Sequence, residues 1–254
     1  MQSDAFIIPD WPVPANIRTM ITTRSGGSSS RFPYDSFNLG NHVGDDEEAV
    51  RQNRNLLSED IGNSTRIQWV KQVHGNGVLV LDDSFVEETT EADALYTRVD
   101  NLACGVLTAD CLSVFFCDDE GNEIAVAHAG WRGLVAGVLQ QTLRQFEAPT
   151  SNILAYLGPV IGPCHFEVGG EVRDAFLDLE IDEIIDQESI LFHESENSGK
   201  WMADLFGIAK IILSVSGIRQ IYGEPICTYC EFDRFYSYRR DGETGRFASL
   251  IWKE

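Results

Sequence analysis

Three short apolar segments follow one another in the middle of the chain, and they restrict the fold more than any other feature. They are Cys104–Thr108, Leu112–Cys117 and Ile124–His128. Short apolar runs of this length are typical of β-strands in a protein core. The sequence therefore predicts a β-sheet region here, and the connections between its strands become the first place to look for polar, functional residues.

Other segments are assigned from alternation, β-branched residues and helix-end signals. Acidic residues in a first turn suit the helix dipole, and an Asn-Gly pair at positions 76–77 indicates a tight turn between two strands. Further strands are predicted at Arg18–Thr23, Ile67–Val73, Val78–Leu81, Ile153–Leu157, Phe235–Tyr238 and Phe247–Trp252. Helices are predicted from Asp45 through Leu57, over Leu134–Phe146, and near Val172–Leu179 and Asp204–Val215.

The order of these elements indicates the fold class. They show neither regular strand–helix alternation nor a purely β pattern, so the sequence predicts an α+β fold, with layered mixed sheets covered by helices. The Ser25–Ser30 stretch is too short for a domain linker, and no change in composition marks a second domain. We therefore expect one domain over residues 1–254.

The charge of the chain limits the partners it can bind. With 40 acidic and 19 basic residues, the net charge is -21. Broad binding to nucleic acid or to an anionic membrane is not expected, because neutralising phosphates needs clustered Lys and Arg. A small anionic substrate remains compatible with this charge if a few arginines converge locally.

The N-terminal sequence and the cysteines favour a cytoplasmic protein. MQSDAFIIPDWPVP has no basic region followed by an apolar stretch, so it does not resemble a signal peptide, and no segment is apolar enough to span a membrane. The six cysteines are expected to be reduced thiols. Without an exposed apolar stripe or a heptad pattern, we expect a monomer.

Two histidines and a cysteine form a candidate metal site. His74 and His128 each end a predicted strand beside a glycine, and Cys111 lies between two apolar strands. Two imidazoles and one thiolate leave a fourth position open, which is the catalytic pattern for zinc. Taken singly, each His is more often a hydrogen-bonded structural residue and the Cys a core residue, and spacing alone does not decide between these alternatives.

Cys227 and Cys230 form a C-x-x-C pair, which by itself suggests a redox pair or half of a zinc site. The chain has no second C-x-x-C and no βαβ context around this one. A comparison with the deaminase signature H-x-E…P-C-x-x-C also fails, because Pro225 is not adjacent to Cys227. The pair is therefore set aside as a metal site.

Motifs from Thr22 to Trp252 occur in the order of one known family, and several are long and unusual. They are TTRSGG, FNLGNHVGDD, KQVHG, TEADAL, TADCLSVFF, AVAHAGWRG, LGPVIGPCHFEVG and FYSYRRDGETGR. On these motifs the chain resembles the YfiH-type laccase-domain family. Its members are described as purine nucleoside phosphorylases, polyphenol oxidoreductases and a peptidoglycan editing factor. The resemblance implies a single α+β domain with layered sheets and flanking helices.

The resemblance also implies a set of catalytic residues. In the family the metal is held by the His of QVHG, the Cys of ADC and the His of HAGWRG, which here are His74, Cys111 and His128. With zinc bound, Cys111 is expected as a thiolate. Asp110 is expected to act as a general base or to orient a ligand; the alternative is that it caps a turn or pairs with Arg132.

Substrate-binding roles are expected for four residues. Arg24 precedes a Gly-Gly loop and Arg132 follows His128 by four positions, so both are candidates for an anion site, although any one arginine is more often part of a surface ion pair. Asp93 lies near a strand start and could support a ligand. Cys164 lies in a Gly- and Pro-rich loop that could line a pocket. The family often has a second Cys at position 165, where this chain has His165.

Three functions follow from this reading. The first is a zinc-dependent purine nucleoside enzyme that phosphorolyses adenosine, inosine, guanosine and S-methyl-5'-thioadenosine and deaminates adenosine. The second is a peptidoglycan-editing amidase that hydrolyses UDP-MurNAc-L-serine, a nucleotide-sugar cell-wall precursor. The third is a non-catalytic metal-binding module. Copper is compatible with the ligands, but a four-copper laccase is not expected, because the chain has five His and no H-x-H pair.

Overall fold

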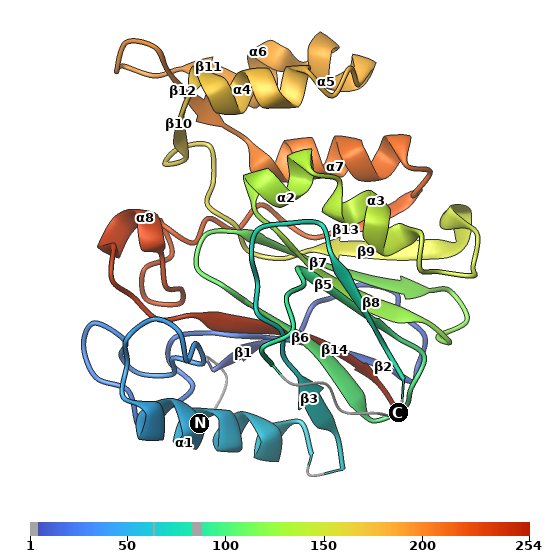
Figure 1. Ribbon diagram of the computed structural model, residues 1–254, viewed down its shortest axis with the longest axis vertical. Coiled ribbons are helices and arrows are strands. Elements are labelled where there is room, and N and C mark those ends of the chain that lie inside the picture. The colour runs from blue at the N-terminus through green and yellow to red at the C-terminus, as the bar shows by residue number, and fades with distance from the viewer. Residues whose placement is uncertain (1–4, 63, 83–87) are drawn as a thin grey trace.

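Two mixed β-sheets, packed face to face, form the centre of the protein (Figure 1). The computed structural model describes residues 5–62, 64–82 and 88–254. Within these residues, one sheet has five strands in the order β1-β2-β14-β6-β3 and the other has six in the order β13-β9-β7-β8-β5-β4. The predicted α+β class with layered sheets and flanking helices is confirmed.

The five-stranded sheet joins the two ends of the chain. Its strands are β1 (Phe6–Ile7), β2 (Ile17–Thr22), β14 (Phe247–Lys253), β6 (Leu102–Thr108) and β3 (Arg66–Gln68). The last strand, β14, lies between β2 and β6 and is antiparallel to both, whereas β3 is parallel to β6. Because β14 pairs with both β2 and β6, this sheet is complete only when β14 is in place.

The six-stranded sheet contains the second and third of the three apolar segments. Its strands are β13 (Gln220–Tyr222), β9 (Ile153–Leu157), β7 (Leu112–Asp118), β8 (Ile124–Ala129), β5 (Ala94–Thr97) and β4 (Val78–Leu81). The first apolar segment, β6, belongs to the other sheet. The three residues 109–111 therefore carry the chain from one sheet to the other.

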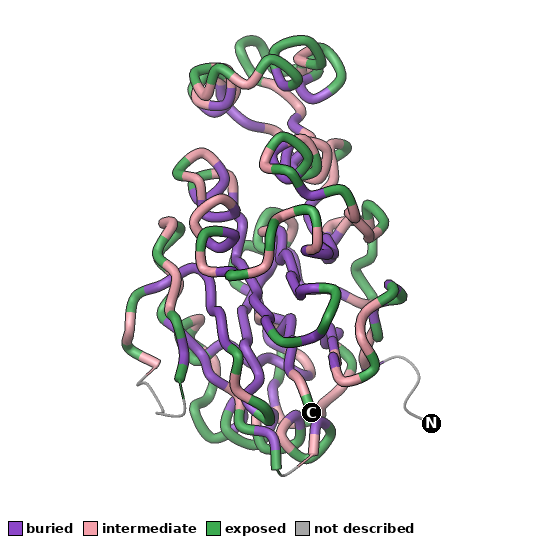
Figure 2. Tube along the Cα trace, turned by 90° about the vertical axis from the view of Figure 1, so that its right-hand side faces the viewer, coloured by how far each residue is buried: buried purple, intermediate pink, exposed green. Residues whose placement is uncertain are grey.

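Both faces of the six-stranded sheet are buried, which explains its unbroken apolar strands. Along β7, Phe115 packs with the core between the two sheets, while Val114 and Phe116 face the opposite core beneath the helices. This alternation is the two-residue period of a strand. In Figure 2 the buried residues accordingly concentrate in the two large sheets.

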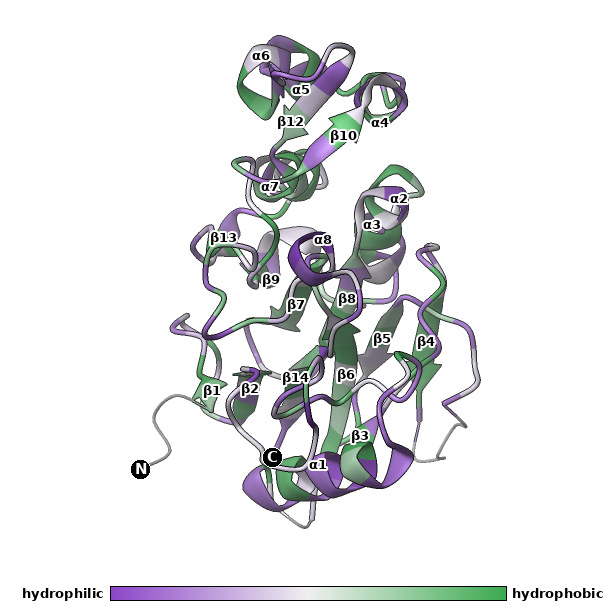
Figure 3. Ribbon diagram, turned by 90° about the vertical axis from the view of Figure 1, so that its left-hand side faces the viewer, coloured by the Kyte–Doolittle hydropathy of each residue, from purple (hydrophilic) through white to green (hydrophobic). Residues whose placement is uncertain are grey.

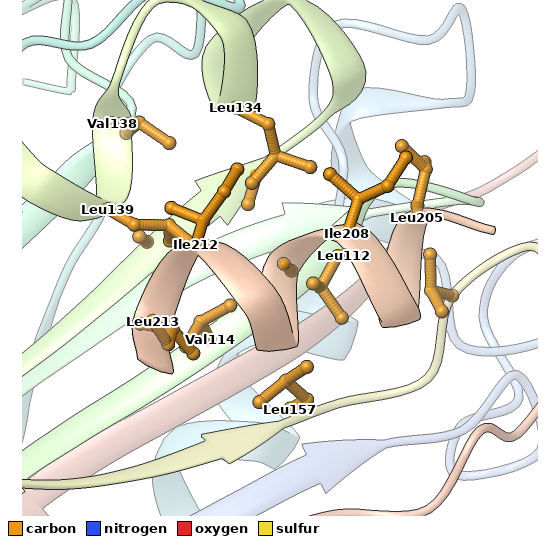
Figure 4. Packing of buried hydrophobic residues seen from close by; sticks show 14 of the residues in the cluster. Leu112, Val114, Leu134, Val138, Leu139, Leu157, Leu205, Ile208, Ile212 and Leu213 are labelled. Carbon is orange, nitrogen blue, oxygen red and sulfur yellow. The ribbon is translucent and has the colours of Figure 1, made fainter. Parts of the chain in front are cut away.

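Helices cover the outer face of each sheet. On the six-stranded sheet lie α2 (Trp131–Val135), α3 (Val138–Leu143) and α7 (Leu205–Val215), whose apolar side chains meet those of β7 and β9 (Figure 4). On the five-stranded sheet lies α1 (Glu47–Asp60), with Asp46 accepting a hydrogen bond from the Ala49 N–H as N-cap. The predicted helices at the positions of α1 and α7 are confirmed.

A third, smaller sheet lies beyond α7 at the top of Figure 1. It consists of β10 (Glu167–Gly169), β12 (Lys200–Ala203) and β11 (Phe192–Glu194), with α4 (Gly170–Leu177), α5 (Asp182–Asp186) and α6 (Glu188–Leu191) against it. The helix predicted near Val172–Leu179 corresponds to α4. The short strands around it were not predicted, since three or four half-exposed residues carry little alternation.

Three sequence predictions about elements are wrong. The helix predicted over Leu134–Phe146 is broken by Gly137, whose φ of 84° ends α2 and begins α3. The strand predicted over Ile67–Val73 ends with β3 at Gln68. The segment Phe235–Tyr238 forms no strand: its first two residues are buried by side-chain packing, and Ser237 caps α8 (Tyr238–Asp241) by accepting the Arg240 N–H.

The short helix α8 is strongly hydrophilic, in contrast to the apolar strands of the two large sheets (Figure 3). A one-turn 3₁₀ helix over Thr150–Asn152 precedes β9. Among the described residues, no helix has the length and apolar character needed to cross a membrane.

Adjacent leucines in α1 provide a test of the core packing. Leu57 is fully buried and Leu56 is 39% exposed. We expect Leu57→Ala to lower the free energy of unfolding by about 2–5 kcal/mol, because it leaves a cavity against the five-stranded sheet. Leu56→Ala, the matched control, should cost about 0.5 kcal/mol or less. Urea denaturation measures both, and equal losses would contradict the packing of α1.

Candidate metal centre

Three separate segments bring His74, Cys111 and His128 together. His74 lies in the turn before β4, Cys111 is the last residue of the crossing between the sheets, and His128 lies on β8. One ligand atom from each residue lies within 4.8 Å of the other two. The Sγ atom of Cys111 is 3.9 Å from Nε2 of His74. A tetrahedral zinc ion would separate sulfur and nitrogen ligands by roughly 3.5 Å, so this group is suited to a single ion.

The side chains of Cys111 and His74 leave room only for glycine at position 130. A Cβ atom there would lie 2.9 Å from Cys111 Sγ and 3.2 Å from His74 Cδ2. On the other side, His74 and Asp110 both have positive φ angles, of 59° and 93°. Non-glycine residues hold this conformation at a cost of about 1–3 kcal/mol, and they do so mainly at functional sites.

Asp93 holds both histidines in place. This fully buried residue precedes β5, and its carboxylate accepts hydrogen bonds from His128 Nδ1 at 2.8 Å and from the backbone N–H groups of His74 at 2.9 Å and Gly75 at 2.7 Å. Burial raises the pKa of Asp93, but the hydrogen bonds from His128 and the backbone outweigh it, so the net pKa lies below the usual range.

The ionised Asp93 fixes the tautomer of His128. A carboxylate can only accept, so Nδ1 must carry the proton, and Nε2 is left to face Cys111 and a metal. Asp93, which was expected to bind substrate, is placed by the structure where it supports two of the ligands. Its side chain lies behind the ligands, is fully buried and does not line the cavity described below.

Cys111 and His128 are electrostatically coupled. Burial raises the pKa of the Cys111 thiol, but the neighbouring His128 and His74 outweigh it and hold the pKa well below its usual value. Burial lowers the pKa of His128, but Cys111 and Asp93 outweigh it and raise that pKa. The thiolate, which is the form that binds metals, is thus already favoured in this environment.

A cavity of about 420 Å³ opens beside the three residues. This volume lies within the range of small-molecule sites. Besides His74, Cys111 and His128, its walls include four aromatic or histidine side chains, three arginines and three other polar side chains. These are Trp131, Phe166, Tyr238, His42, Arg132, Arg239, Arg246, Gln72, Thr108 and Asp110.

The three arginines give the cavity local positive charge, although the chain as a whole is acidic. Arg239 donates to the carbonyls of His165 and Glu167, and Arg246 donates to two carbonyls of its own loop. Arg132 differs from both: its guanidinium lies 4.3 Å from the Trp131 ring centroid and, among the described residues, has no hydrogen-bond or ion-pair partner. Its donors are therefore available to a ligand.

Asp110 lines the cavity, but both of its carboxylate oxygens are engaged. Oδ1 accepts from the Thr228 hydroxyl and Oδ2 from the Arg239 backbone N–H, each at 2.7 Å. It does not pair with Arg132. Because both oxygens already accept hydrogen bonds and the backbone is left-handed, the geometry of Asp110 suits a residue that positions Cys111. It does not suit a free general base.

The remaining two predicted residues lie outside the cavity. Arg24 donates to the carbonyl of Asp35 and to that of Phe232, and its guanidinium lies 4.9 Å from the Tyr236 ring centroid. The structure therefore places Arg24 away from this cavity, and the anion-binding role expected of it stays a prediction. Cys164 does not line the cavity either; it lies near Cys227 and Cys230.

Sequence reasoning missed several cavity residues that its own motifs contained. Gln72 precedes His74 by two positions and both donates to and accepts from the backbone of Leu107 at 2.8 Å, which ties the His74 turn to β6. Arg246 ends the motif that also contains α8. The motifs contain these residues, but the side-chain directions that bring them into one cavity depend on the fold.

Comparison with known proteins identifies the family. A family model described as "Multi-copper polyphenol oxidoreductase laccase" matches residues 18–254. The chain belongs to this family. The same family contains relatives that cover nearly the whole chain, so the predicted resemblance to YfiH-type proteins is confirmed.

Several curated relatives are similar to this chain over nearly its whole length. A purine nucleoside phosphorylase of Pseudomonas aeruginosa is 47% identical, over 98% of this chain and 98% of that protein. Purine nucleoside phosphorylase YfiH of Escherichia coli is 45% identical, over 97% and 98% of the two chains. Among solved structures, a Neisseria meningitidis protein has a TM-score of 0.91 and 46% identity, covering 98% and 99% of the two chains.

Removing the charge of Asp93 tests its role at the metal centre. We expect Asp93→Asn to lower zinc affinity about 10- to 100-fold, since His128 and the His74 turn lose the acceptor that orients them. Competition with a chelating dye measures this. Glu91→Gln is the matched control, because Glu91 lies two positions away and pairs with Lys71 on the surface. Unchanged affinity in Asp93→Asn would contradict this role.

Proposed function

We propose that this protein is a zinc-dependent purine nucleoside phosphorylase that also deaminates adenosine, with His74, Cys111 and His128 as the zinc ligands. The observation that carries the proposal is the ligand set itself: two imidazoles and one thiol converge at a cavity that also contains arginines. The names of the relatives from Pseudomonas aeruginosa and Escherichia coli support the same activity.

The chemistry of the ligands favours zinc. Imidazole nitrogen and thiolate sulfur are the usual ligands of this ion, and three protein ligands leave one position for a substrate or water. The family description mentions several coppers, but the five histidines of the chain include no H-x-H pair. A copper ion at the same ligands is an alternative occupant, whereas a multi-copper cluster does not fit them.

Different parts of this cavity suit the two substrates of phosphorolysis, phosphate and a nucleoside. A phosphate oxygen forms a bond to C1' of the ribose, the bond from C1' to the purine nitrogen breaks, and the purine leaves with the bonding electrons and takes up a proton. We propose that Arg132, whose donors are available, binds the phosphate, with Arg246 and Arg239 adding positive charge. Zinc, when bound, supplies a Lewis acid that polarises a substrate oxygen or activates water.

The aromatic walls support a purine as the other substrate. Trp131, Phe166 and Tyr238 line the cavity, and flat heteroaromatic rings stack on such side chains. Asp110 is proposed to hold the sheet crossing and hence Cys111 in place, because its oxygens are already hydrogen-bonded. Inosine, guanosine and S-methyl-5'-thioadenosine share the purine ring and are proposed as further substrates.

We also propose that the protein acts in the cytoplasm as a monomer. All six cysteines are free, and Cys164 and Cys230 are exposed. Exposed thiols persist in a reducing compartment.

Replacing Cys111 tests the proposed function. We expect the parent protein to release adenine from adenosine only when phosphate is present. We expect Cys111→Ala to lose the zinc ion held by His74, Cys111 and His128, and to lose this activity at least about 100-fold, because an ion left with two ligands is weakly held. Cys117→Ala, which removes a fully buried thiol from β7, is the control and should keep both. Chromatography of the released base and elemental analysis provide the measurements.

Other outcomes of this assay separate the alternatives. Ammonia released without phosphate would indicate deamination as the main reaction. Zinc bound by the parent without any turnover of nucleosides would contradict the nucleoside proposal and favour the amidase, which is tested by serine release from UDP-MurNAc-L-serine. Full activity in Cys111→Ala would contradict the role of the metal centre.

The phosphate site is tested separately at Arg132. We expect Arg132→Gln to raise KM for phosphate about 10- to 100-fold, because the variant loses a charged hydrogen bond to phosphate. The change in KM for adenosine should be smaller. Arg144→Gln is the control, because Arg144 is exposed and lies outside the cavity. Steady-state kinetics with each substrate varied distinguishes the two. An unchanged KM for phosphate would exclude Arg132 as its ligand.

A further inference from the structure

A second group of potential metal ligands lies outside the cavity of the candidate metal centre. Cys164 and His165 lie in the irregular segment between β9 and β10, and Cys227 and Cys230 lie in the turn that follows β13. In the sequence the C-x-x-C pair was set aside because the chain has no second C-x-x-C and no βαβ context around this one. The fold supplies partner ligands from a segment more than sixty residues earlier.

Three of these side chains, Cys164, His165 and Cys230, have the separations of ligands around one ion, and Cys227 lies next to that group of three. Ligand atoms of Cys164, His165 and Cys230 all lie within 4.8 Å of one another. The Sγ atom of Cys164 is 3.6 Å from that of Cys230 and 3.9 Å from that of Cys227. Two thiolates on a tetrahedral zinc ion, with Zn–S bonds of about 2.3 Å, are roughly 3.8 Å apart. A disulfide would need about 2.05 Å.

The sulfur of Cys227 is surrounded by backbone donors. The Gly162 N–H donates to it at 3.2 Å, and the N–H groups of Tyr229 and Cys230 are also hydrogen-bonded to it. Such donors favour a negatively charged sulfur and orient it, as outer partners do for metal ligands. His165 is oriented in turn by stacking on Tyr229, with ring centroids 3.8 Å apart.

We propose that Cys164, His165, Cys227 and Cys230 bind a second zinc ion, distinct from the one at the candidate metal centre. Three thiolates and one imidazole make a complete four-ligand set, which is the pattern of a structural zinc site rather than a catalytic one. The site also accounts for two exposed thiols, Cys164 and Cys230, which would otherwise be open to oxidation. This proposal does not depend on the proposed enzymatic function.

A zinc ion here would join the two segments that hold Asp110. Thr228, inside the C-x-x-C turn, donates to the Asp110 carboxylate, and the Ile161 N–H donates to the Asp110 carbonyl at 2.9 Å. Arg240 of α8 holds the same turn by donating to the carbonyls of Thr228 and Tyr229. Because Asp110 precedes Cys111, the second site would stabilise the wall of the first without contacting its ligands.

Metal content of single-site variants tests this inference. We expect the parent, purified without chelators, to bind about twice as much zinc as either Cys164→Ser/Cys230→Ser or Cys111→Ala, because each variant loses one site. Cys117→Ala, which removes a thiol belonging to neither group, is the control and should bind as much zinc as the parent. Zinc content in Cys164→Ser/Cys230→Ser equal to that of the parent would overturn the proposal.

Cobalt substitution provides a second readout, and the strength of the parent's own absorption band does not depend on how the variants fold. Thiolate-to-cobalt absorption grows with the number of sulfur ligands, so Cys111→Ala should keep most of the parent band and Cys164→Ser/Cys230→Ser should lose most of it. A parent band no stronger than that of one thiolate would overturn the proposal. So would a non-reduced intact mass lighter than the reduced one by one hydrogen molecule, because it would reveal a disulfide instead.

Discussion

The buried carboxylate of Asp93 is the interaction on which the candidate metal centre depends. It lies at the start of β5 and accepts hydrogen bonds from His128 on the neighbouring strand and from the backbone of the His74 turn. A buried charge is costly unless it is fully paired, and here the pairing partners are the groups that must be oriented. The same interaction therefore stabilises the fold locally and sets the direction of two ligands.

The third ligand depends on the way the two large sheets are connected. Residues 109–111 cross from β6 to β7, and Asp110 fixes this crossing through Thr228 and Arg239. Gly130 leaves the space that Cys111 and His74 occupy. Residues from early, middle and late parts of the sequence thus meet at one cavity. In the five-stranded sheet, β14 lies between β2 and β6 and so brings late and early parts of the sequence together.

Much of this arrangement could be predicted from the sequence, for reasons that differ by element. The apolar strands β7 and β8 were predictable because both of their faces are buried, and His74, Cys111 and His128 because they lie in long motifs. The short strands β10 to β13 carry too few residues for a pattern. The position of Arg24 away from the cavity could not be predicted, because its partners, the carbonyls of Asp35 and Phe232, come near it only in the folded chain. The proximity of Cys227 and Cys230 to Cys164 could not be predicted either, because the two segments are distant in sequence.

The central claim is that His74, Cys111 and His128 bind one metal ion with Asp93 behind them. A crystal structure of protein purified without chelators, with diffraction data collected on both sides of the zinc absorption edge, tests it most directly. The account predicts an anomalous peak within bonding distance of Cys111 Sγ and of the Nε2 atoms of His74 and His128. Full-length protein with no anomalous peak among these three residues, while zinc is present elsewhere in the crystal, would contradict it.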